Sequence, residues 1–404
     1  MQTEVPQLEL TILMPCLNEA ETVGGCVRIA RSYLRSRDIH GEVLVADNGS
    51  SDDSVGIANR EGARIIHVPT RGYGSALAAG IEAARGEFVV MGDADASYDF
   101  SGLDPFLSHL RQGSDLVVGN RFRGGIAPGA MPALHRYLGN PLLSFLGRLF
   151  FRAPIGDIYC GLRGMRRSSV LGLQLSSKGM EFANEMVAKA VLDGQRVTEV
   201  PTTLSPDGRS RRPHLRSFRD GWRTIRFLFL FCPNWLYLVP GVVLMSVGLA
   251  LTVFLVIGQV RIGDVVFDVG TLIYCAFLAA TGYQAVLFGI LSKAYARAAG
   301  FQPSSRLLDR IVRLSSIEAG LITGFVLLVS GIALAVVSFL RWQEVGFGEL
   351  ATSQHIRVIL PAALGFFLGV QTILGVLFLG AMTVGRRAPM SPKRDWVELG
   401  DRVH

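Results

Sequence analysis

The first 120 residues alternate between short apolar runs and segments with helical spacing. Uninterrupted apolar runs are typical of strands buried on both faces, whereas Val23, Val27 and Ala30 recur at the spacing of one helix face. The expected strands are residues 8–14, 42–46, 63–68, 87–91 and 116–119, and the expected helices are residues 19–37 and 75–84. Alternation of this kind predicts a parallel sheet with helices on both faces.

Residues 121–215 break this alternation. They are rich in Gly, Pro and Arg, and only one helix is clear, near residues 180–192. We interpret the segment as the second half of the same domain, which then spans residues 1–215. In parallel sheets of this kind, ligands bind beyond the carboxyl ends of the strands. Asp47 and Asp93 both fall at such ends, as a shared site requires.

Four long apolar runs dominate residues 236–385. Each holds about 20 residues or more without a charge, which is enough to span a bilayer as a helix. The runs are residues 236–258, 269–292, 319–340 and 358–384. We therefore predict a membrane domain of four helices that could form two hairpins. Because such helices can pack within or between chains, a homo-oligomer is possible.

The segment before the first apolar run is amphipathic. Residues 216–235 place Arg219, Arg223 and Arg226 at helical spacing beside Trp222 and further aromatic side chains. This composition predicts a helix that lies along a lipid headgroup layer. An ordinary amphipathic surface helix is the alternative, and the adjoining apolar run favours the interface.

The distribution of charge predicts an orientation. The chain carries 40 Lys and Arg against 33 Asp and Glu, a net charge of +7. Basic residues concentrate between the second and third apolar runs and in the tail, residues 386–404, and basic loops of membrane proteins lie in the cytoplasm. We therefore expect both termini and the N-terminal domain to be cytoplasmic. No basic helix with base-reading side chains is recognisable, so anionic lipid and phosphate are favoured as partners over nucleic acid.

Cysteine usage and the N-terminus agree with that compartment. Five cysteines are scattered without a Cys-x-x-Cys pair, which predicts neither a zinc site nor a redox pair. The first ten residues lack the basic and apolar regions of a signal peptide. Both observations favour reduced thiols in a cytoplasmic domain.

Two carboxylates stand one residue apart at the end of an apolar strand. Asp93 and Asp95 follow the run FVVMG, and both can face one point if the chain turns there. Hard oxygen ligands suit Mg²⁺ or Mn²⁺, which usually share their coordination shell with substrate phosphates. A solvated surface turn is the alternative for so short a motif. The buried strand before it favours the metal site.

Two loops near neighbouring strand ends suit polar ligands. Asp47 opens a turn-rich loop, and its carboxylate could accept hydrogen bonds from a nucleobase. Alternatively, the loop is a capping cluster in which Ser50 or Ser51 caps the next helix. Residues 71–76 place Gly74 at the start of a helix, where backbone N–H groups can approach an anion.

Six segments then follow in a fixed order: PCLNEAETV, VADNGSSDDS, RGYGSALAAG, GDADASYD, GNRF and DIYCGLRGMRR. In this order they resemble the GT-A glycosyltransferases of family 2, and most closely the polyprenyl-phosphate (dolichyl-phosphate) mannosyl and glucosyl transferases. The resemblance covers roughly residues 8–235. It implies a GT-A fold, a Rossmann-like mixed sheet, followed by membrane helices whose number differs among members.

The resemblance also implies how a donor is bound. Asp93 and Asp95 stand at the diphosphate and metal site, with Mg²⁺ or Mn²⁺ as cofactor. Arg209 matches a basic position on a mobile loop that closes over the donor. The implied nucleotide-sugar contacts are Pro15, Asn18, Glu19, Asp47, Gly74, Asp93, Asp95 and Arg209.

Three residues are implied to act near the acceptor. Arg121 and Arg136 match arginines that contact phosphate, whose oxygens a planar guanidinium binds in pairs. Asp157 matches an aspartate close to the reacting centre, so that Asp95, Asp157 and Arg121 are the candidate catalytic residues. Because a phosphomonoester has a second pKa of about 6, it needs no strong base to attack. Asp157 therefore orients the acceptor, orients an arginine, or takes a last proton.

Two positions depart from the family pattern. Ser97 stands where mannosyl members often carry a glutamine that ligates the metal, so water is the alternative third ligand. Tyr73 replaces a lysine that is frequent in the glycine loop. These departures leave the full ligand set of the metal open.

Together the motifs predict an inverting transferase that faces the cytoplasm. It would pass a hexose from a nucleotide sugar of the GDP-mannose or UDP-glucose type to a membrane polyprenyl phosphate. A processive polysaccharide synthase is one alternative, although the Gln-x-x-Arg-Trp segment of those enzymes has no counterpart here. A non-catalytic membrane scaffold or lipid translocase is another, and the intact Asp93, Asp95 and Arg121 argue against it.

Overall fold

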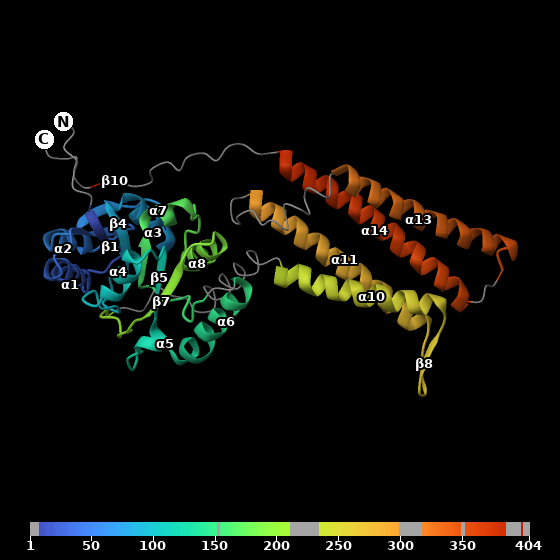
Figure 1. Cartoon of the computed structure of the whole chain (residues 1–404), viewed down its shortest axis with the longest axis horizontal. Helices are drawn as coiled ribbons and strands as arrows, with labels where there is room; N and C mark the ends of the chain where they lie inside the picture. Colours follow the sequence, from blue (N-terminus) through green and yellow to red (C-terminus); the bar gives the residue numbers. More distant parts are fainter. Residues whose placement is uncertain are drawn as a thin grey trace. The chain divides into compact units, whose positions relative to one another are not determined.

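The computed structural model describes residues 8–151, 154–210, 234–298, 317–348, 352–384 and 397–398. The chain forms two compact units (Figure 1). The sheet unit comprises Met1–Leu228 with Pro389–His404, and the helical unit comprises Phe229–Ala388. The expected interfacial segment, except for residues 234–235, and the tail, except for residues 397–398, lie outside the described residues.

One mixed sheet forms the centre of the sheet unit. Its strand order is β10-β3-β2-β1-β4-β6-β5-β7. β6 runs antiparallel to both neighbours, β10 runs antiparallel to β3, and the other adjacent pairs are parallel. The strands are β1 (Leu8–Cys16), β2 (Gly41–Asp47), β3 (Arg64–His67), β4 (Gly86–Met91), β5 (Leu116–Asn120), β6 (Arg163–Arg166), β7 (Val197–Pro201) and β10 (Val397–Glu398).

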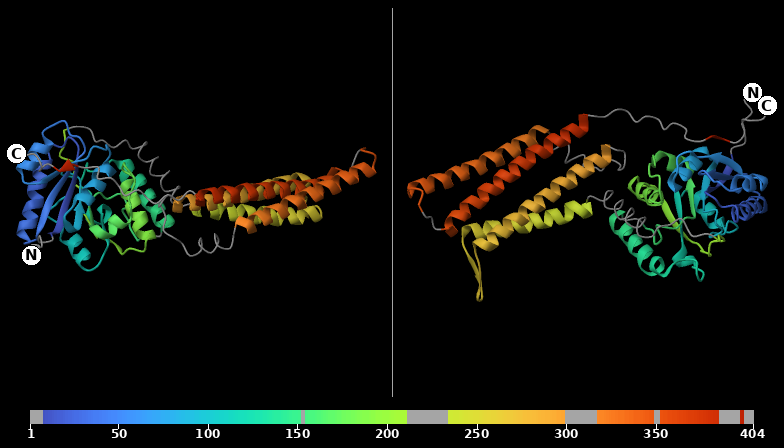
Figure 2. Two further views of the ribbon diagram at one scale, coloured as in Figure 1. Left: turned by 90° about the horizontal axis from the view of Figure 1, so that it is seen from above. Right: turned by 180° about the vertical axis from the view of Figure 1, so that it is seen from behind.

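Helices cover both faces of this sheet (Figure 2). α1 reaches α4 through a hydrogen bond from the Tyr33 hydroxyl to Asp104, whereas α3 contacts α7 and α8. The helices are α1 (Val23–Ser36), α2 (Ser54–Arg60), α3 (Tyr73–Ala83), α4 (Asp104–Arg111), α5 (Arg121–Gly124), η1 (His135–Gly139, a π-helix), α6 (Asn140–Phe151), α7 (Arg167–Gly172) and α8 (Phe182–Leu192). The GT-A-like mixed sheet expected from the sequence is therefore confirmed.

Two local expectations are wrong. Residues 121–215 hold more than the one helix at α8, because α6 and the strands β6 and β7 also lie there. β6 was not predicted because it begins at the fully buried Arg163, and a charged residue at a core position breaks the apolar pattern that predicts a strand. Neither Ser50 nor Ser51 caps a helix. α2 begins only at Ser54, and the Ser50 hydroxyl accepts a hydrogen bond from the Asn18 N–H at 2.9 Å instead.

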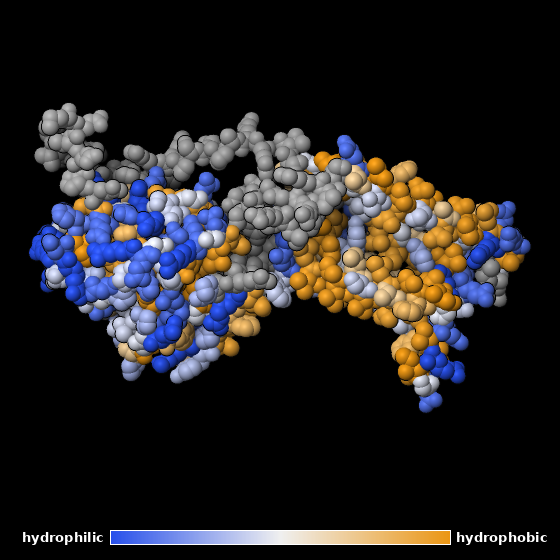
Figure 3. Space-filling model, viewed as in Figure 1, coloured by the Kyte–Doolittle hydropathy of each residue, from blue (hydrophilic) through white to orange (hydrophobic). Residues whose placement is uncertain are grey.

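The helical unit contains four helices long and apolar enough to cross a membrane, Asn234–Ile257, Val269–Tyr295, Ile317–Glu344 and Ser353–Met382. The predicted membrane helices are thus confirmed, and their surface is dominated by apolar side chains (Figure 3). The elements are η2 (Asn234–Leu238), α10 (Val239–Ile257), β8 (Val260–Ile262), β9 (Val265–Phe267), α11 (Val269–Ala298), α13 (Ile317–Glu344) and α14 (Thr352–Val384).

The four helices pack as two hairpins, α10 with α11 and α13 with α14. Glycine allows the close approach in each: a Cβ on Gly248 would lie 2.4 Å from the backbone nitrogen of Ala279, and one on Gly331 equally close to that of Phe366. Small residues at helix contacts are typical of membrane bundles. Arg357 on α14 joins the hairpins, since it pairs with Asp268 and donates to the carbonyl of Leu255.

Candidate active site

The candidate residues gather at the carboxyl edge of the sheet. Glu19 follows β1, Asp47 ends β2, Asp93 and Asp95 follow β4, and Arg121 follows β5. β1, β2 and β4 are parallel, and β5 runs in the same direction because β6, which lies between β4 and β5, is antiparallel to both. The carboxyl ends of these strands therefore meet at one edge. The expected convergence of distant motifs is therefore what the structure shows.

Asp95 is held by a tight turn. Ala96 adopts a left-handed backbone with φ of 65°, which is unfavourable for a residue with a Cβ and typical of functional sites. The turn lets the N–H and hydroxyl of Ser97 donate to Asp95 Oδ1 at 3.0 and 2.5 Å. The Thr22 hydroxyl donates to the Ala94 carbonyl at 2.7 Å and ties this turn to α1. Ser97 thus orients Asp95 through hydrogen bonds.

Asp93 contacts the glycine loop at the start of α3. The Tyr73 hydroxyl donates to Asp93 Oδ1 at 2.9 Å, so the residue that replaces the family lysine contacts the carboxylate itself. Gly161 lies against the other oxygen: a Cβ there would come within 2.8 Å of Asp93 Oδ2. Burial, followed by the nearby charge of Asp95, raises the pKa of Asp93 to about 6. The Asp93 and Asp95 carboxylates are therefore close enough for their negative charges to repel each other.

Arg209 supplies a positive charge to these carboxylates. Its guanidinium pairs with Asp95 Oδ2 through Nη2, and its Nε lies 3.2 Å from Glu19 Oε2. The loop that carries Arg209 lies on the Asp95 turn, because the Gly208 N–H donates to the Asp95 carbonyl at 2.9 Å. The structure therefore places Arg209 on the carboxylates of the expected metal site.

The donor set fits a divalent cation shared with a substrate. A cationic group is already held by Asp95, and Asp93 lies beside it as a second hard ligand. Among the described residues, no group of three or more His, Cys, Asp or Glu side chains could hold a metal ion. Mg²⁺ usually takes one or two carboxylates and completes its shell with water and phosphate oxygens. The two aspartates suit that arrangement.

A second arginine is fixed more rigidly. Arg121 donates to both oxygens of Asp157, with Nε 2.7 Å from Oδ2 and Nη2 2.8 Å from Oδ1, and its backbone N–H adds a third bond at 3.1 Å. Asp157 is fully buried and Arg121 is 7% exposed. Burial alone would lower the pKa of Arg121, but Tyr98 and Asp157 raise it above its usual value. Arg121 therefore stays charged.

Asp157 holds the guanidinium of Arg121 in one orientation. Both its oxygens are taken by Arg121, so of the three roles left open by the sequence the orientation of an arginine matches the structure. Glu199 on β7 fixes the loop in turn, since its Oε1 accepts from the N–H groups of Gly156 at 2.7 Å and Asp157 at 3.0 Å. The sequence reasoning missed Glu199. A single Glu in the short segment VTEVP carried no signal of its distant partners.

The expected nucleotide pocket has local hydrogen bonds of its own. Asn18 accepts from the Ser51 N–H at 2.7 Å, and the Glu19 N–H donates to the Ser54 hydroxyl at 2.7 Å. Asp47 accepts from its own loop at Ser50 N–H, 3.1 Å away, and lies 3.1 Å from His67 Nδ1. Pro15 lies in β1, one residue before its end. These contacts bring the predicted residues together, and their contact with a nucleotide stays a prediction.

The glycine loop differs from its expected role. The N–H groups of Gly74 and Ser75 donate to the carbonyl of Lys178 at 2.9 and 3.3 Å, so they do not point to a vacant anion site. A phosphate contact through Gly74 gains no support from this arrangement, because a glycine N–H cannot serve two acceptors well. The loop instead presents the Tyr73 hydroxyl to Asp93.

Arg136 lies on η1, whereas the candidate carboxylates follow strands of the sheet. Its guanidinium stacks over the ring of Tyr137, 5.6 Å from the centroid, and none of the contacts found within the described residues joins it to Arg121. Large apolar side chains on η1 and α6 are exposed, and part of this surface is visible at the α6 end of the sheet unit (Figure 3). We call this surface the α6 stripe: Leu134, Tyr137, Leu138, Leu142, Phe145 and Leu149.

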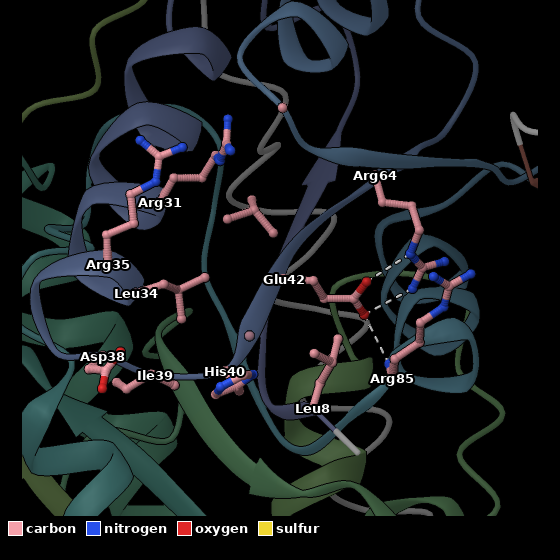
Figure 4. Close-up of a pocket in the computed structure, with 13 residues that line it drawn as sticks. Leu8, Arg31, Leu34, Arg35, Asp38, Ile39, His40, Glu42, Arg64 and Arg85 are labelled. Atoms are coloured by element: carbon pink, nitrogen blue, oxygen red, sulfur yellow. Dashed lines mark hydrogen bonds and ion pairs between the residues drawn. The ribbon is translucent and has the colours of Figure 1, made fainter. Parts of the chain in front are cut away.

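A hollow of about 670 Å³ lies at the opposite edge of the sheet. It is lined by the starts of β1, β2 and β3, so it is separate from the strand ends that carry the aspartates. Glu42 stands at its centre and accepts from the Arg64 guanidinium and from the backbone N–H of Arg85 (Figure 4). Arg31 and Arg35 approach from α1. This basic hollow takes no part in the candidate site.

Comparisons with known proteins assign the family. The family model for glycosyl transferase family 2 matches residues 11–172. The family model for the glycosyltransferase family 2 C-terminal transmembrane region matches residues 290–383. The chain is 34% identical to low-salt glycan biosynthesis hexosyltransferase Agl6 of Haloferax volcanii over 377 residues. The aligned region covers 92% of this chain and 89% of that protein. The chain belongs to glycosyltransferase family 2. This family 2 glycosyltransferase is an integral membrane protein.

Two further similarities are more partial. The family 2 chain is 30% identical to the dolichyl-phosphate hexose transferase of Haloferax volcanii over 49% of this chain and 84% of that protein. Among solved structures, glucosyl-3-phosphoglycerate synthase of Mycobacterium tuberculosis is 21% identical, with a TM-score of 0.45 over 56% of this chain and 80% of that one. The resemblance read from the six motifs is confirmed at the level of the family.

Proposed function

We propose that this glycosyltransferase passes a hexose from a nucleotide sugar, of the GDP-mannose or UDP-glucose type, to the phosphate of a membrane polyprenyl phosphate. The observation that carries the proposal is the meeting of the Asp93 and Asp95 carboxylates with the fixed Arg121 at one sheet edge. Such an edge can receive a metal-bound diphosphate and a second phosphate side by side. The name of the related dolichyl-phosphate hexose transferase supports this acceptor class.

The reaction follows from the chemistry of the acceptor. A phosphomonoester has a second pKa of about 6, so most of it is a dianion at neutral pH and no general base is required. A phosphate oxygen attacks the anomeric carbon while the bond from that carbon to the diphosphate oxygen breaks on the opposite face. The nucleoside diphosphate leaves with the electron pair. An α-linked donor therefore gives a β-linked lipid product.

The residues divide between the two phosphates. On the donor side, Asp93 and Asp95 would hold Mg²⁺ or Mn²⁺, which when bound neutralises charge on the leaving diphosphate. Arg209 would face the same diphosphate. On the acceptor side, Arg121 would bind the lipid phosphate, because Asp157 takes one edge of its guanidinium and leaves the Nη1 side for a ligand.

The α6 stripe suits a lipid acceptor. Its exposed side chains recur at helical spacing, and Tyr137 at 75% exposure is the most solvent-accessible of them. An apolar helix face flanked by Arg136 and Arg148 is typical of elements that lie in a headgroup layer. The chain is anchored by four membrane helices, so a bilayer is always within its reach. We propose that the stripe rests on that bilayer and that the basic connectors keep the sheet unit cytoplasmic.

A transfer assay tests the proposal. Purified full-length protein in detergent would be incubated with Mn²⁺, polyprenyl phosphate and labelled UDP-glucose or GDP-mannose. We expect a labelled lipid-linked hexose with one of the donors, and its loss in Asp95→Ala. Asp99→Ala is the matched control, because Asp99 lies on the same loop but is exposed, and the hydrogen bonds it makes to described residues go to Ser101. Nucleotide-sugar binding without any lipid-linked product would contradict the proposal and favour a non-catalytic scaffold.

A further inference from the structure

Arg209 occupies an unusual position for a residue that is expected to bind the donor. Its guanidinium pairs with Asp95 Oδ2 and lies 3.2 Å from Glu19 Oε2, and its Nε also lies 4.0 Å from Asp207 Oδ2 on its own loop. The side chain is only 12% exposed, so these contacts are shielded from water. Ion pairs in such surroundings are stronger than surface pairs. The carboxylate cluster therefore has a cation built into the chain.

Asp95 has one oxygen to offer to any other cation. Oδ1 already accepts the N–H and hydroxyl of Ser97, at 3.0 and 2.5 Å. Oδ2 is the oxygen with which Arg209 pairs. A divalent ion that binds Asp95 must therefore share or displace the guanidinium at Oδ2.

The loop can release the side chain without moving its backbone. Around Arg209, the Gly208 N–H donates to the Asp95 carbonyl at 2.9 Å and the Ser210 N–H donates to Glu21 Oε2 at 2.8 Å. The Ser205 N–H donates to the Ser97 carbonyl at 3.0 Å. None of these bonds uses the guanidinium. These backbone bonds can therefore stay in place when Arg209 exchanges its partners.

We propose that Arg209 is an exchangeable counter-ion. It neutralises Asp95 and Glu19 until a metal and a diphosphate bind together, and its guanidinium then pairs with the diphosphate instead. The inference rests on the proposed function of the site. A metal alone competes with Arg209 for Asp95. A metal with a nucleoside diphosphate supplies the displaced guanidinium with a new anion, so the two ligands favour each other's binding. Such coupling is reciprocal, and its usual size is about 5- to 150-fold.

Metal binding, rather than activity, tests the exchange. Binding of Mn²⁺ to the full-length protein would be titrated by electron paramagnetic resonance, first with Mn²⁺ alone and then with UDP or GDP. Arg209→Gln removes the charge and keeps a similar length. We expect this variant to bind Mn²⁺ alone at least about fivefold more tightly than the original chain, and to lose most of the enhancement that the nucleotide produces. Arg60→Gln is the control, because Arg60, at the end of α2, is exposed and pairs with Asp53, the residue before that helix.

Arg209→Lys separates charge from loss of structure. It keeps the positive charge, so its affinity for Mn²⁺ alone should stay closer to that of the original chain than the affinity of Arg209→Gln does. If Arg209→Gln binds Mn²⁺ alone no more tightly than the original chain, the exchange is overturned. If the original chain transfers hexose and binds Mn²⁺ with nucleotide, but Arg209→Gln gains no affinity for Mn²⁺ alone, only this inference fails. If it neither binds Mn²⁺ with either nucleotide nor forms a lipid-linked hexose, the proposed function fails as well.

Discussion

Two arginines at the same sheet edge are held in opposite ways. Arg121 begins α5 and is locked by three bonds to Asp157, whose carboxylate is fully buried. Arg209 sits on a loop and shares its charge between two carboxylates from other elements. The first arrangement is preorganised, because its cation cannot leave without exposing a buried charge. The second is exchangeable, because the carboxylates that hold it also suit a metal.

The proposed function gives a reason for one chain to carry both arrangements. If the acceptor is a lipid phosphate, it brings no metal of its own, so the acceptor side would need a cation that is always in place. If the donor diphosphate arrives with a divalent ion, the donor side would need carboxylates that can bind that ion and that are neutralised in its absence. Electrostatic preorganisation of this kind is usually the largest contribution to catalysis. The predictions that follow weaken one side at a time.

The largest effect is expected from Asp157→Asn. The substitution leaves Arg121 buried without its counter-charge, and breaking one partner of a buried pair typically costs about 3–5 kcal/mol. We expect a clear fall in Tm and a loss of transfer of about a hundredfold or more, since a misplaced phosphate-binding group is poorly tolerated. Thermal melting and the labelled-lipid assay measure the two. Asp53→Asn, at an exposed pair, should change neither, and an unaltered Tm in Asp157→Asn would refute a locked Arg121.

Glu199→Gln should weaken the same side less. The amide oxygen can still accept from Gly156 and Asp157, but charge-assisted hydrogen bonds are roughly twice as strong as neutral ones. We expect a loss on the order of 1 kcal/mol, seen as a several-fold fall in kcat/KM for the lipid acceptor. The KM for the donor should stay the same. An equal effect on both substrates would show that Glu199 serves the whole domain and not the acceptor side.

The pH dependence probes the exchangeable side. Because the pKa of Asp93 is raised to about 6, this carboxyl gains a proton as the pH falls through that value and then no longer offers a negative charge to a metal. Mn²⁺ binding should therefore weaken below about pH 6. Tyr73→Phe removes a hydrogen bond that lowers this pKa, so the midpoint should move upward, by less than about one unit. Tyr33→Phe, a similar phenol on the remote Asp104, should leave the midpoint in place.

Ser97→Ala should produce the smallest change. Asp95 Oδ1 keeps the Ser97 N–H and loses the hydroxyl, which is worth about 1 kcal/mol. The half-saturating Mn²⁺ concentration should rise a few-fold with little change in kcat. Ser101→Ala is an almost exact structural match, because Ser101 bonds to the exposed Asp99 through the same two groups. A rise as large as that of Asp95→Ala would mean that Ser97 itself ligates the metal.

The parts of the site that the sequence predicted are those that follow from strand ends. Apolar runs locate β1, β2 and β4, and parallel topology then brings Glu19, Asp47 and Asp95 to one edge. These steps need only hydrophobic periodicity and the fixed direction of a parallel strand. The same reasoning located the four membrane helices, because their signal is length and apolarity alone.

What the sequence could not predict depends on contacts between distant segments. The pair of Arg121 and Asp157 spans 36 residues, and the contact of Arg209 with Asp95 spans 114. Each residue has an ordinary local context, so no short motif reveals its partner. The use of the Gly74 N–H by Lys178 is equally invisible, since a glycine before a helix suits an anion and a carbonyl alike. Long-range pairing decides which role is taken.

The short strand β10 constrains how the chain is threaded through a bilayer. Val397 and Glu398 pair with His67 and Ile66 on β3, so the segment after the last long helix completes a sheet that was begun before the first. A sheet cannot straddle a membrane, because the hydrocarbon region tolerates no open strand edges. The number of crossings between its two contributions must therefore be even. Loss or gain of a single span would place β10 and β3 on opposite sides of the membrane, so that they could not pair. Pairing of β10 with β3 therefore requires an even number of inserted spans.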